Sequence, residues 1–286
     1  MLVAILLVVF PFAHAEIIFQ DGDVWDAFVG QDFNSNLIKA EEGDARAQYL
    51  VGRALLFGLE EQGVSADQEE GLYWMQEAAD QGAAEAFHAL GILYRRGIGV
   101  DKDGGKWEEY MTEAGEQGLH HAMSELIDTY QDGDPEAGIN QDEEKYLYWL
   151  EKSAEHGSVF SMINLAITYR QGLGVEKDLE KSFEWVMRAV KLDDLSAQRM
   201  AGEYYEKGMV VEQDLVKAYM MYDLSGTVPS TRRDELAKKM TEVQIQEAIS
   251  LSWQWQLEHE KVRPASNGYR YQPDVSDREP IFLTSD

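Results

Sequence analysis

The sequence contains no cysteine, and it has few basic residues for its number of acidic ones. Without cysteine the chain can form neither disulfide bonds nor thiolate zinc sites, and it has no cysteine nucleophile. With 25 Lys and Arg against 53 Asp and Glu, the formal net charge is −28. This charge repels phosphate backbones and anionic membrane surfaces. We therefore expect no nucleic-acid partner, while a basic partner would be attracted.

The apolar run at residues 2–12 is too short to cross a bilayer, which takes about 20 residues. It ends in Ala13-His14-Ala15, which has the small residues of a signal-peptide cleavage site. We expect residues 1–15 to be a secretory signal peptide that is cleaved after Ala15. The mature protein is then periplasmic or secreted, without stable membrane insertion. No Lys or Arg precedes the run, so either the signal is minimal or the true start lies upstream.

Internal repeats are the main signal. Residues 86–97 (AFHALGILYRRG) align with residues 161–172 (SMINLAITYRQG), and parts of three further copies follow the same pattern. Each copy ends in a glycine three residues after an aromatic or apolar residue, which predicts a helix closed by a left-handed residue. An aspartate then follows the connecting loop and is expected to cap a second helix. These aspartates are Asp67, Asp103, Asp142, Asp178 and Asp214. Seven residues later come Trp74, Tyr110, Trp149, Trp185 and Met221, which we expect to fill the space between repeats.

The five repeats run over residues 44–82, 83–118, 119–157, 158–193 and 194–226. The first and third are longer by three residues, and both insertions fall in the loop between glycine and aspartate. In four of the five copies, one position inside the first helix holds a small residue. This predicts the close approach of a neighbouring helix. The residues at this position are Gly52, Gly91, Ala166 and Gly202.

These residues resemble Sel1-like repeats, a family related to tetratricopeptide repeats. Residues 86–118 carry the family pattern, although Trp107 stands at an alanine position, and residues 158–190 match it too. The third repeat departs most, with Ile127 at the small position and Asp134-Pro135 in the loop. The resemblance implies an all-α fold, a right-handed α-solenoid of tandem helix-turn-helix repeats with helical caps.

The ends of the array carry further helical patterns. Residues 16–43, with Trp25, Phe28, Leu37, Ile38 and Ala40, are expected to contain an N-terminal capping helix. Residues 227–260 are expected to hold capping helices, one at 234–240 and one opened by the capping box Thr241–Gln244. The second should direct Ile245, Ala248, Ile249, Ser252 and Trp255 toward the repeats. Residues 261–286 are polar and contain proline, so we expect a flexible tail.

The sequence gives little support for a catalytic, metal or cofactor site. The loops Gly97-Ile98-Gly99 and Gly172-Leu173-Gly174 follow helices and lack a Gly-Lys-Ser/Thr element, so they join paired helices. His120, with His121, Glu125 and Asp128, is the nearest approach to a metal constellation, but exposed polar residues explain it better. We expect no catalytic residue, no bound metal and no cofactor.

By analogy with tetratricopeptide repeats, the first helices should line the concave face and hold a partner there. The residues expected on this face are Arg53, His88, Arg95, Asp128, Arg170, Arg199 and Glu203. Its four arginines could hold a partner's carboxylates. Alternatively, they pair with acidic residues of the chain itself.

We therefore expect an exported, non-enzymatic scaffold or adaptor that binds a protein or peptide. Two alternatives stay open. One is a hydrolase, as in the cysteine-rich β-lactamase group that this family includes, although this chain lacks those cysteines. The other is a domain that binds cationic material through its acidic exterior, which strong salt dependence would reveal.

Overall fold

The computed structural model describes residues 31–226 and 231–259, and within these ranges the chain is helical with no strand. The predicted signal peptide, the predicted tail and the cap residues Trp25 and Phe28 lie outside the described residues. Contacts divide the chain into two compact units between His156 and Gly157. The predicted class, an all-α solenoid built from tandem helix pairs, is confirmed.

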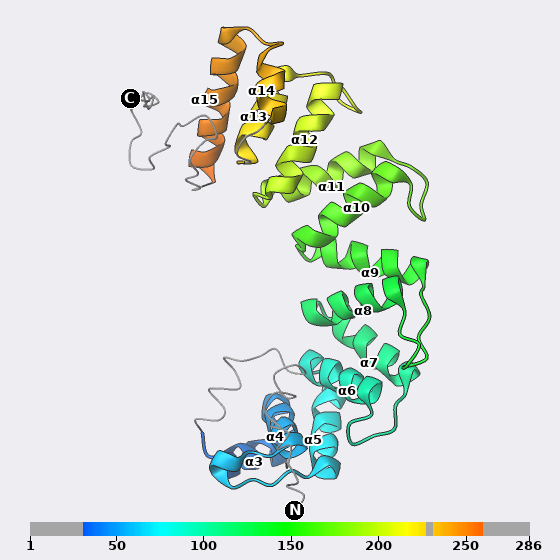
Figure 1. Ribbon diagram of the computed structural model, residues 1–286. Helices are drawn as coiled ribbons and strands as arrows, with labels where there is room; N and C mark the ends of the chain where they lie inside the picture. Colours follow the sequence, from blue (N-terminus) through cyan, green and yellow to red (C-terminus); the bar gives the residue numbers. More distant parts are fainter. Residues whose placement is uncertain (1–30, 227–230, 260–286) are drawn as a thin grey trace, which may run out of the picture. The chain divides into compact units, whose positions relative to one another are not determined.

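In the first unit every α-helix packs against the next α-helix along the chain (Figure 1). The helices are α3 (Phe33–Glu41), α4 (Ala45–Phe57), the short η1 (Glu60–Gln62), α5 (Gln68–Asp80), α6 (Ala84–Arg96), α7 (Gly104–Glu116), α8 (His120–Asp132) and α9 (Glu143–Glu155). Repeat 1 is the pair α4–α5, repeat 2 is α6–α7 and repeat 3 is α8–α9. The helix α3 precedes the repeats and packs on α4.

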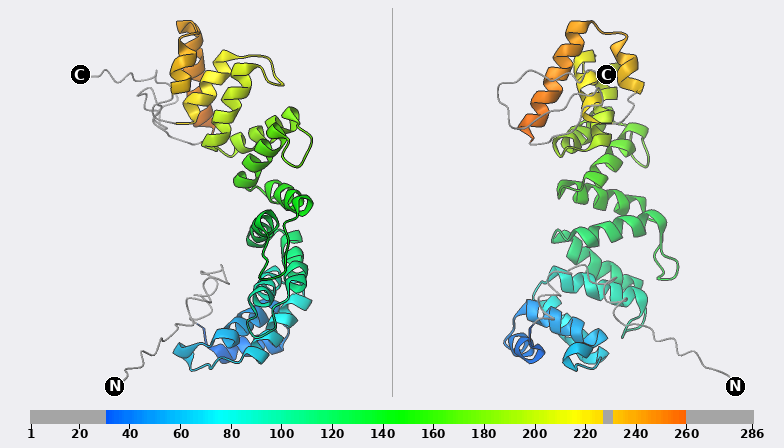
Figure 2. Two further views of the ribbon diagram at one scale, coloured as in Figure 1. Left: turned by 45° about the vertical axis from the view of Figure 1, so that its right-hand side comes forward. Right: turned by 60° about the vertical axis from the view of Figure 1, so that its left-hand side comes forward.

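The second unit continues the same scheme (Figure 2). Its helices are α10 (Val159–Gln171), α11 (Leu179–Lys191), α12 (Leu195–Lys207), α13 (Leu215–Leu224), α14 (Thr231–Ala237) and α15 (Glu242–Glu258). Repeat 4 is the pair α10–α11 and repeat 5 is α12–α13. Both α14 and α15 pack on α13.

The five aspartates cap their helices as predicted. In each second helix the carboxylate accepts a hydrogen bond from the backbone amide three residues further on, at 2.9–3.0 Å. The glycines before the loops adopt positive φ, for example 71° at Gly97 and 73° at Gly172. Asp193 stands where other repeats have glycine between second and first helices, and it keeps the left-handed conformation with φ 64°. Position in the repeat therefore decides the backbone, even where the residue type changes.

The small residues of the first helices mark close contacts with the second helix of the same repeat. A Cβ on Gly52 would lie 2.9 Å from the carbonyl oxygen of Gly71, and one on Gly202 would lie 2.6 Å from the ring of Tyr222. In repeat 4 the carbonyl of Ala166 accepts a hydrogen bond from Ser182 Oγ at 2.6 Å. The predicted close approach is confirmed.

The predicted role of the large apolar residue between repeats holds for Trp149. Its ring packs against Gly115 of the preceding repeat, where a Cβ would lie 2.6 Å from the ring. Tyr110 also reaches backward, since its hydroxyl donates to Gln76 Oε1 at 2.9 Å. Trp185 differs, because it is only partly buried and the Arg188 guanidinium lies over its ring at 4.4 Å.

The two inserted loops have the same local structure. An isolated antiparallel bridge joins Leu59 to Val64 in the first repeat and Asp134 to Ile139 in the third. The apolar members Leu59 and Ile139 are buried. The extra residues thus close a small turn that is anchored by an apolar side chain, while the helices keep their register.

At the C-terminal end two expectations need correction. The helix expected at 234–240 is α14, which begins at Thr231 and ends at Ala237. In α15, Ala248, Ile249 and Ser252 are buried and Ile245 is partly buried against the same cluster, as expected. Trp253 packs there in place of Trp255, whose ring stacks on His259 at 3.9 Å. The capping box between Thr241 and Gln244 is present.

Candidate partner-binding face

The first helices of the first unit differ in how much surface they leave open. The helix α4 packs against both α3 and α5, and its residues from Ala47 to Leu56 are all buried. Arg53 is only 2% exposed and His88, on α6, is 5% exposed. Neither side chain offers a partner much surface, because neighbouring helices cover the faces on which they lie.

An ion-pair network connects α6 with α8. His88 Nε2 lies 3.3 Å from Glu125 Oε1, and Arg95 Nη1 lies 3.6 Å from the other oxygen of Glu125. Arg95 Nε donates to Asp134 Oδ2 at 2.7 Å, and its guanidinium lies over the Trp107 ring at 5.5 Å. The structure thus brings His88 and Arg95 together through Glu125. The carboxylates that Arg95 holds belong to its own chain.

The electrostatics of α8 are acidic. Loss of solvent raises the pKa of the Asp128 carboxyl, and the like charges of Asp132 and Glu125 add to the rise. Burial lowers the pKa of His121, and the neighbouring His88 and His120 lower it further. Within the described ranges no three His, Cys, Asp or Glu side chains are placed to hold a metal ion.

The second unit places the remaining candidates on α10 and α12. Arg170, near the end of α10, donates to Glu203 Oε2 on α12 at 2.7 Å. Lys207 Nζ lies 3.8 Å from the same oxygen, and Arg199 is exposed one turn before Glu203. Arg170, Arg199 and Glu203 therefore come together, and they lie in a different unit from Arg53, His88, Arg95 and Asp128.

An apolar surface on α10 was not among the predicted site residues. Phe160 is 67% exposed, and Ile163 and Ile167 are partly exposed on the same side of the helix. The signal for it is present in the sequence, because α10 carries apolar residues on all sides and a solvated helix is normally polar on one. Its other apolar residues are buried, such as Leu165, or partly buried.

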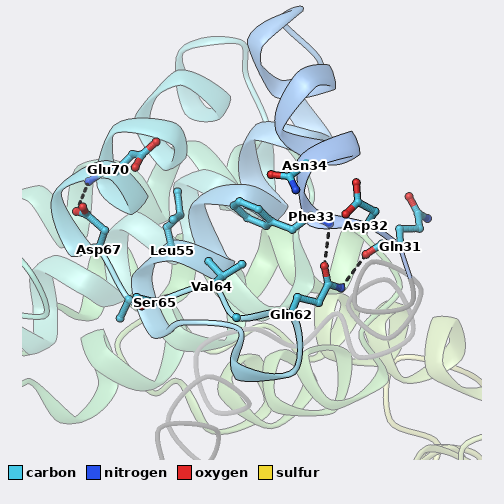
Figure 3. A pocket seen from close by; sticks show the side chains of 12 residues that line it. Gln31, Asp32, Phe33, Asn34, Leu55, Gln62, Val64, Ser65, Asp67 and Glu70 are labelled. Carbon is cyan, nitrogen blue, oxygen red and sulfur yellow. Dashed lines mark hydrogen bonds between the residues drawn. The ribbon is translucent and has the colours of Figure 1, made fainter.

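A pocket of about 900 Å³ lies at the start of the first unit, between the N-terminus of α3 and the inserted loop of repeat 1 (Figure 3). Gln62 bridges its two sides: its side-chain oxygen accepts from the amide of Phe33 at 2.8 Å, and its side-chain nitrogen donates to the carbonyl of Gln31 at 2.7 Å. The carboxylates of Asp32 and Asp67 are occupied as helix caps. Gln62, Asp32 and Asp67 therefore stabilise the fold at this pocket.

Across the described residues, no helix combines the length and the apolar character needed to cross a membrane.

Comparison with known proteins gives one family match, to the Sel1 repeat. It covers residues 45–82, 84–119, 121–158, 159–194 and 195–226. A 69-residue stretch is 35% identical to a component of an ERAD-associated E3 ubiquitin-protein ligase, HRD3A of Arabidopsis thaliana. That stretch is 24% of this chain and 10% of the plant protein, so the match spans only a small part of this curated relative.

Several solved structures are similar, among them two from bacteria. A Sel1 repeat protein from Oxalobacter formigenes is 24% identical with a TM-score of 0.50, over 73% of this chain and 59% of that one, which supports the fold. A protective antigen of uropathogenic Escherichia coli is 26% identical with a TM-score of 0.49, over 86% of this chain and 52% of that one.

Proposed function

The chain belongs to the Sel1 repeat family, and from this we propose that it is a non-enzymatic scaffold that binds another protein through its first helices. The family membership rests on five matched repeats that span most of residues 45–226. A relative that matches over part of its length is named as a component of a ligase. A role within a larger assembly is therefore consistent with the comparison.

The observation that carries this proposal is the open face of α10. Phe160 is the most exposed aromatic side chain among the described residues, and it stands on a helix whose remaining apolar residues are buried or partly buried. Contiguous exposed apolar surface marks binding sites in soluble proteins, and Phe160 lies on the same side of α10 as the partly exposed Ile163 and Ile167. Aromatic residues are also the usual anchors of protein interfaces.

Comparative affinity capture tests the proposal. The full chain, the variant Phe160→Glu and the control Val243→Glu are immobilised and exposed to an extract of the cells that naturally make the protein. Val243 is 76% exposed at the start of α15, so the control adds the same charge on a different helix. We expect the wild type and the control to retain the same proteins and Phe160→Glu to lose at least one. An identical set on all three would contradict the proposed face.

We also propose that the protein is exported. The support is the apolar run at residues 2–12 and the small residues before Glu16, which together suit cleavage after Ala15. The intact mass of the protein recovered from the cell envelope or the medium measures this directly. A mature chain that begins at Glu16 is expected, and an unprocessed chain that stays inside the cell would contradict export.

A further inference from the structure

The surroundings of Glu203 differ in charge from the rest of the chain. Three cations act on this one carboxylate: Arg170 at 2.7 Å, Lys207 at 3.8 Å and Arg199 on the same helix. Burial would raise the pKa of Glu203, but the hydrogen bond from Arg170 and the three positive charges outweigh it and lower the pKa. The cluster formed by these four residues has a local charge of about +2, although the chain as a whole carries −28.

The apolar surface of α10 leads to this cluster. Phe160, Ile163, Ile167 and Arg170 follow at spacings of three, four and three residues, so they lie along one side of the helix. Along the sequence these four residues alternate with buried residues of the same helix, among them Met162, Leu165 and Ala166. One continuous strip thus begins with exposed apolar side chains and ends at the guanidinium that binds Glu203.

The neighbouring helix continues the face. By alignment of the repeats, Arg199 stands at the position of Ile163, Glu203 at that of Ile167 and Lys207 at that of Gln171. Arg199 is exposed, and Lys207 has 47% of its side chain in solvent. Glu203 is one carboxylate beside three cations. Donor groups of these cations therefore remain available to an anionic group of a partner.

We propose that this face, defined as Phe160, Ile163, Ile167, Arg170, Arg199 and Lys207, binds a segment of a partner protein in which apolar side chains are followed by Asp or Glu. The inference rests on the proposed function and names the partner chemistry for it. The apolar anchors of the segment cover Phe160, Ile163 and Ile167. Its carboxylates bind Arg199 and Lys207, while Glu203 keeps the Arg170 guanidinium in position.

Charge complementarity selects this class of partner. A basic segment would be attracted by the chain at long range, but at this face it would meet three cations. Beyond about 10 Å, salt at about 0.1 M weakens both this attraction and the repulsion that the negative chain exerts on an acidic segment. At contact distance the cations act on it with little screening. The face therefore selects an acidic segment through interactions at short range.

Selection from a phage-displayed library of random short peptides on the full-length protein tests the inference. We expect the selected peptides to be enriched in aromatic or aliphatic residues followed by Asp or Glu. A labelled peptide from that pool should bind Arg199→Glu and Phe160→Glu about tenfold more weakly or worse than the wild type. The matched control Arg188→Glu reverses an exposed arginine on α11 and should bind as the wild type does. All variants are first checked for helix content and unfolding midpoint.

Two outcomes would overturn the inference. One is a selected pool without acidic residues, or one whose binding is indifferent to both Arg199→Glu and Phe160→Glu. The other is a dimer in solution that Phe160→Glu dissociates, since a second copy would then be the occupant. If the pool fails while affinity capture still depends on Phe160, the scaffold function stands and only the partner chemistry is wrong. If capture is also indifferent, both are wrong.

Discussion

The hydroxyl of Tyr204 on α12 donates to Ser182 Oγ on α11 at 2.6 Å, and both side chains are fully buried. Ser182 in turn donates to the carbonyl of Ala166 on α10. One serine therefore connects three successive helices across the junction between repeats 4 and 5. If one partner of such a buried hydrogen bond is removed, the other partner stays unsatisfied, which lowers the free energy of unfolding.

Removing this serine hydroxyl should destabilise the protein. We expect Ser182→Ala to lower the free energy of unfolding by about 1–3 kcal/mol, because the Tyr204 hydroxyl stays buried without its acceptor. Tyr204→Phe in the same background should then cost little more, because the Tyr204 hydroxyl has already lost its acceptor. Urea unfolding measures each. The exposed Ser250→Ala is the control and should stay within about 0.5 kcal/mol of the wild type. Equal effects at both serines would refute the bridge.

Gly202→Ala should be destabilising although alanine favours helices. The new methyl group would lie 2.6 Å from the Tyr222 ring, which is itself buried. We expect a loss of about 1–3 kcal/mol in the free energy of unfolding from this overpacking. Gly105→Ala, near the exposed start of α7, is the control and should gain up to about 1 kcal/mol. A stabilising Gly202→Ala would show that the close contact is absent.

Val210 adopts φ 57°, where the equivalent residues Gly99 and Gly174 have φ 69° and 66°. A β-branched residue is strained in this conformation. Val210→Gly should therefore raise the free energy of unfolding by about 0.5–1 kcal/mol, even after the greater freedom of glycine in the unfolded chain is counted. The reciprocal change Gly174→Val should lower it by a similar amount or more. The prediction fails if both substitutions shift the unfolding midpoint in the same direction.

The Asp134 carboxylate should give a pH-dependent contribution to stability. Burial alone would raise its pKa, but hydrogen bonds from Arg95 and from the amides of Ala137 and Glu136 hold the pKa below its ordinary value. The folded pKa is thus lower than the unfolded one, so the stabilisation is complete above the unfolded value. It is lost as the pH falls through the folded value.

Asp134→Asn keeps the shape and removes the charge. At neutral pH we expect it to lower the free energy of unfolding by about 1 kcal/mol. The gap to the wild type should close as the pH falls below the ordinary pKa of an aspartate. Urea unfolding over a pH series measures this gap. If it keeps the same size at acid pH, the Asp134 charge is not its source.

Local features of the fold could be predicted from the sequence because they depend on neighbours in the chain. The cap at Asp178 needs only the amide of Lys181, and the turn at Gly172 needs only its own backbone freedom. The close approach at Gly202 was also predictable, since a small residue recurs at one position of the repeat. Because the repeat occurs five times, the contact between two helices could be recognised from the sequence pattern.

The predicted face residues depend on partners from other repeats, and these were harder to foresee. Arg95 pairs with Glu125 and Asp134, which lie in the next repeat and in its inserted loop. Arg53 is buried because α4 has packed neighbours on both sides, which no property of Arg53 reveals. Trp253 and Trp255 are two residues apart on α15, and the pattern could not tell which one packs inward.

The position that holds Arg95 and Arg170 in repeats 2 and 4 holds Glu206 in repeat 5, where the carboxylate accepts from Arg232 of α14 and from the Tyr222 hydroxyl. The junctions that follow repeats 2, 4 and 5 therefore use different ion pairs. A duplicated repeat 4 would set Ile167 opposite Arg170, and a duplicated repeat 5 would separate Glu206 from Arg232. These ion pairs depend on the order of the repeats, so lengthening the array requires new charged residues as well as new helices.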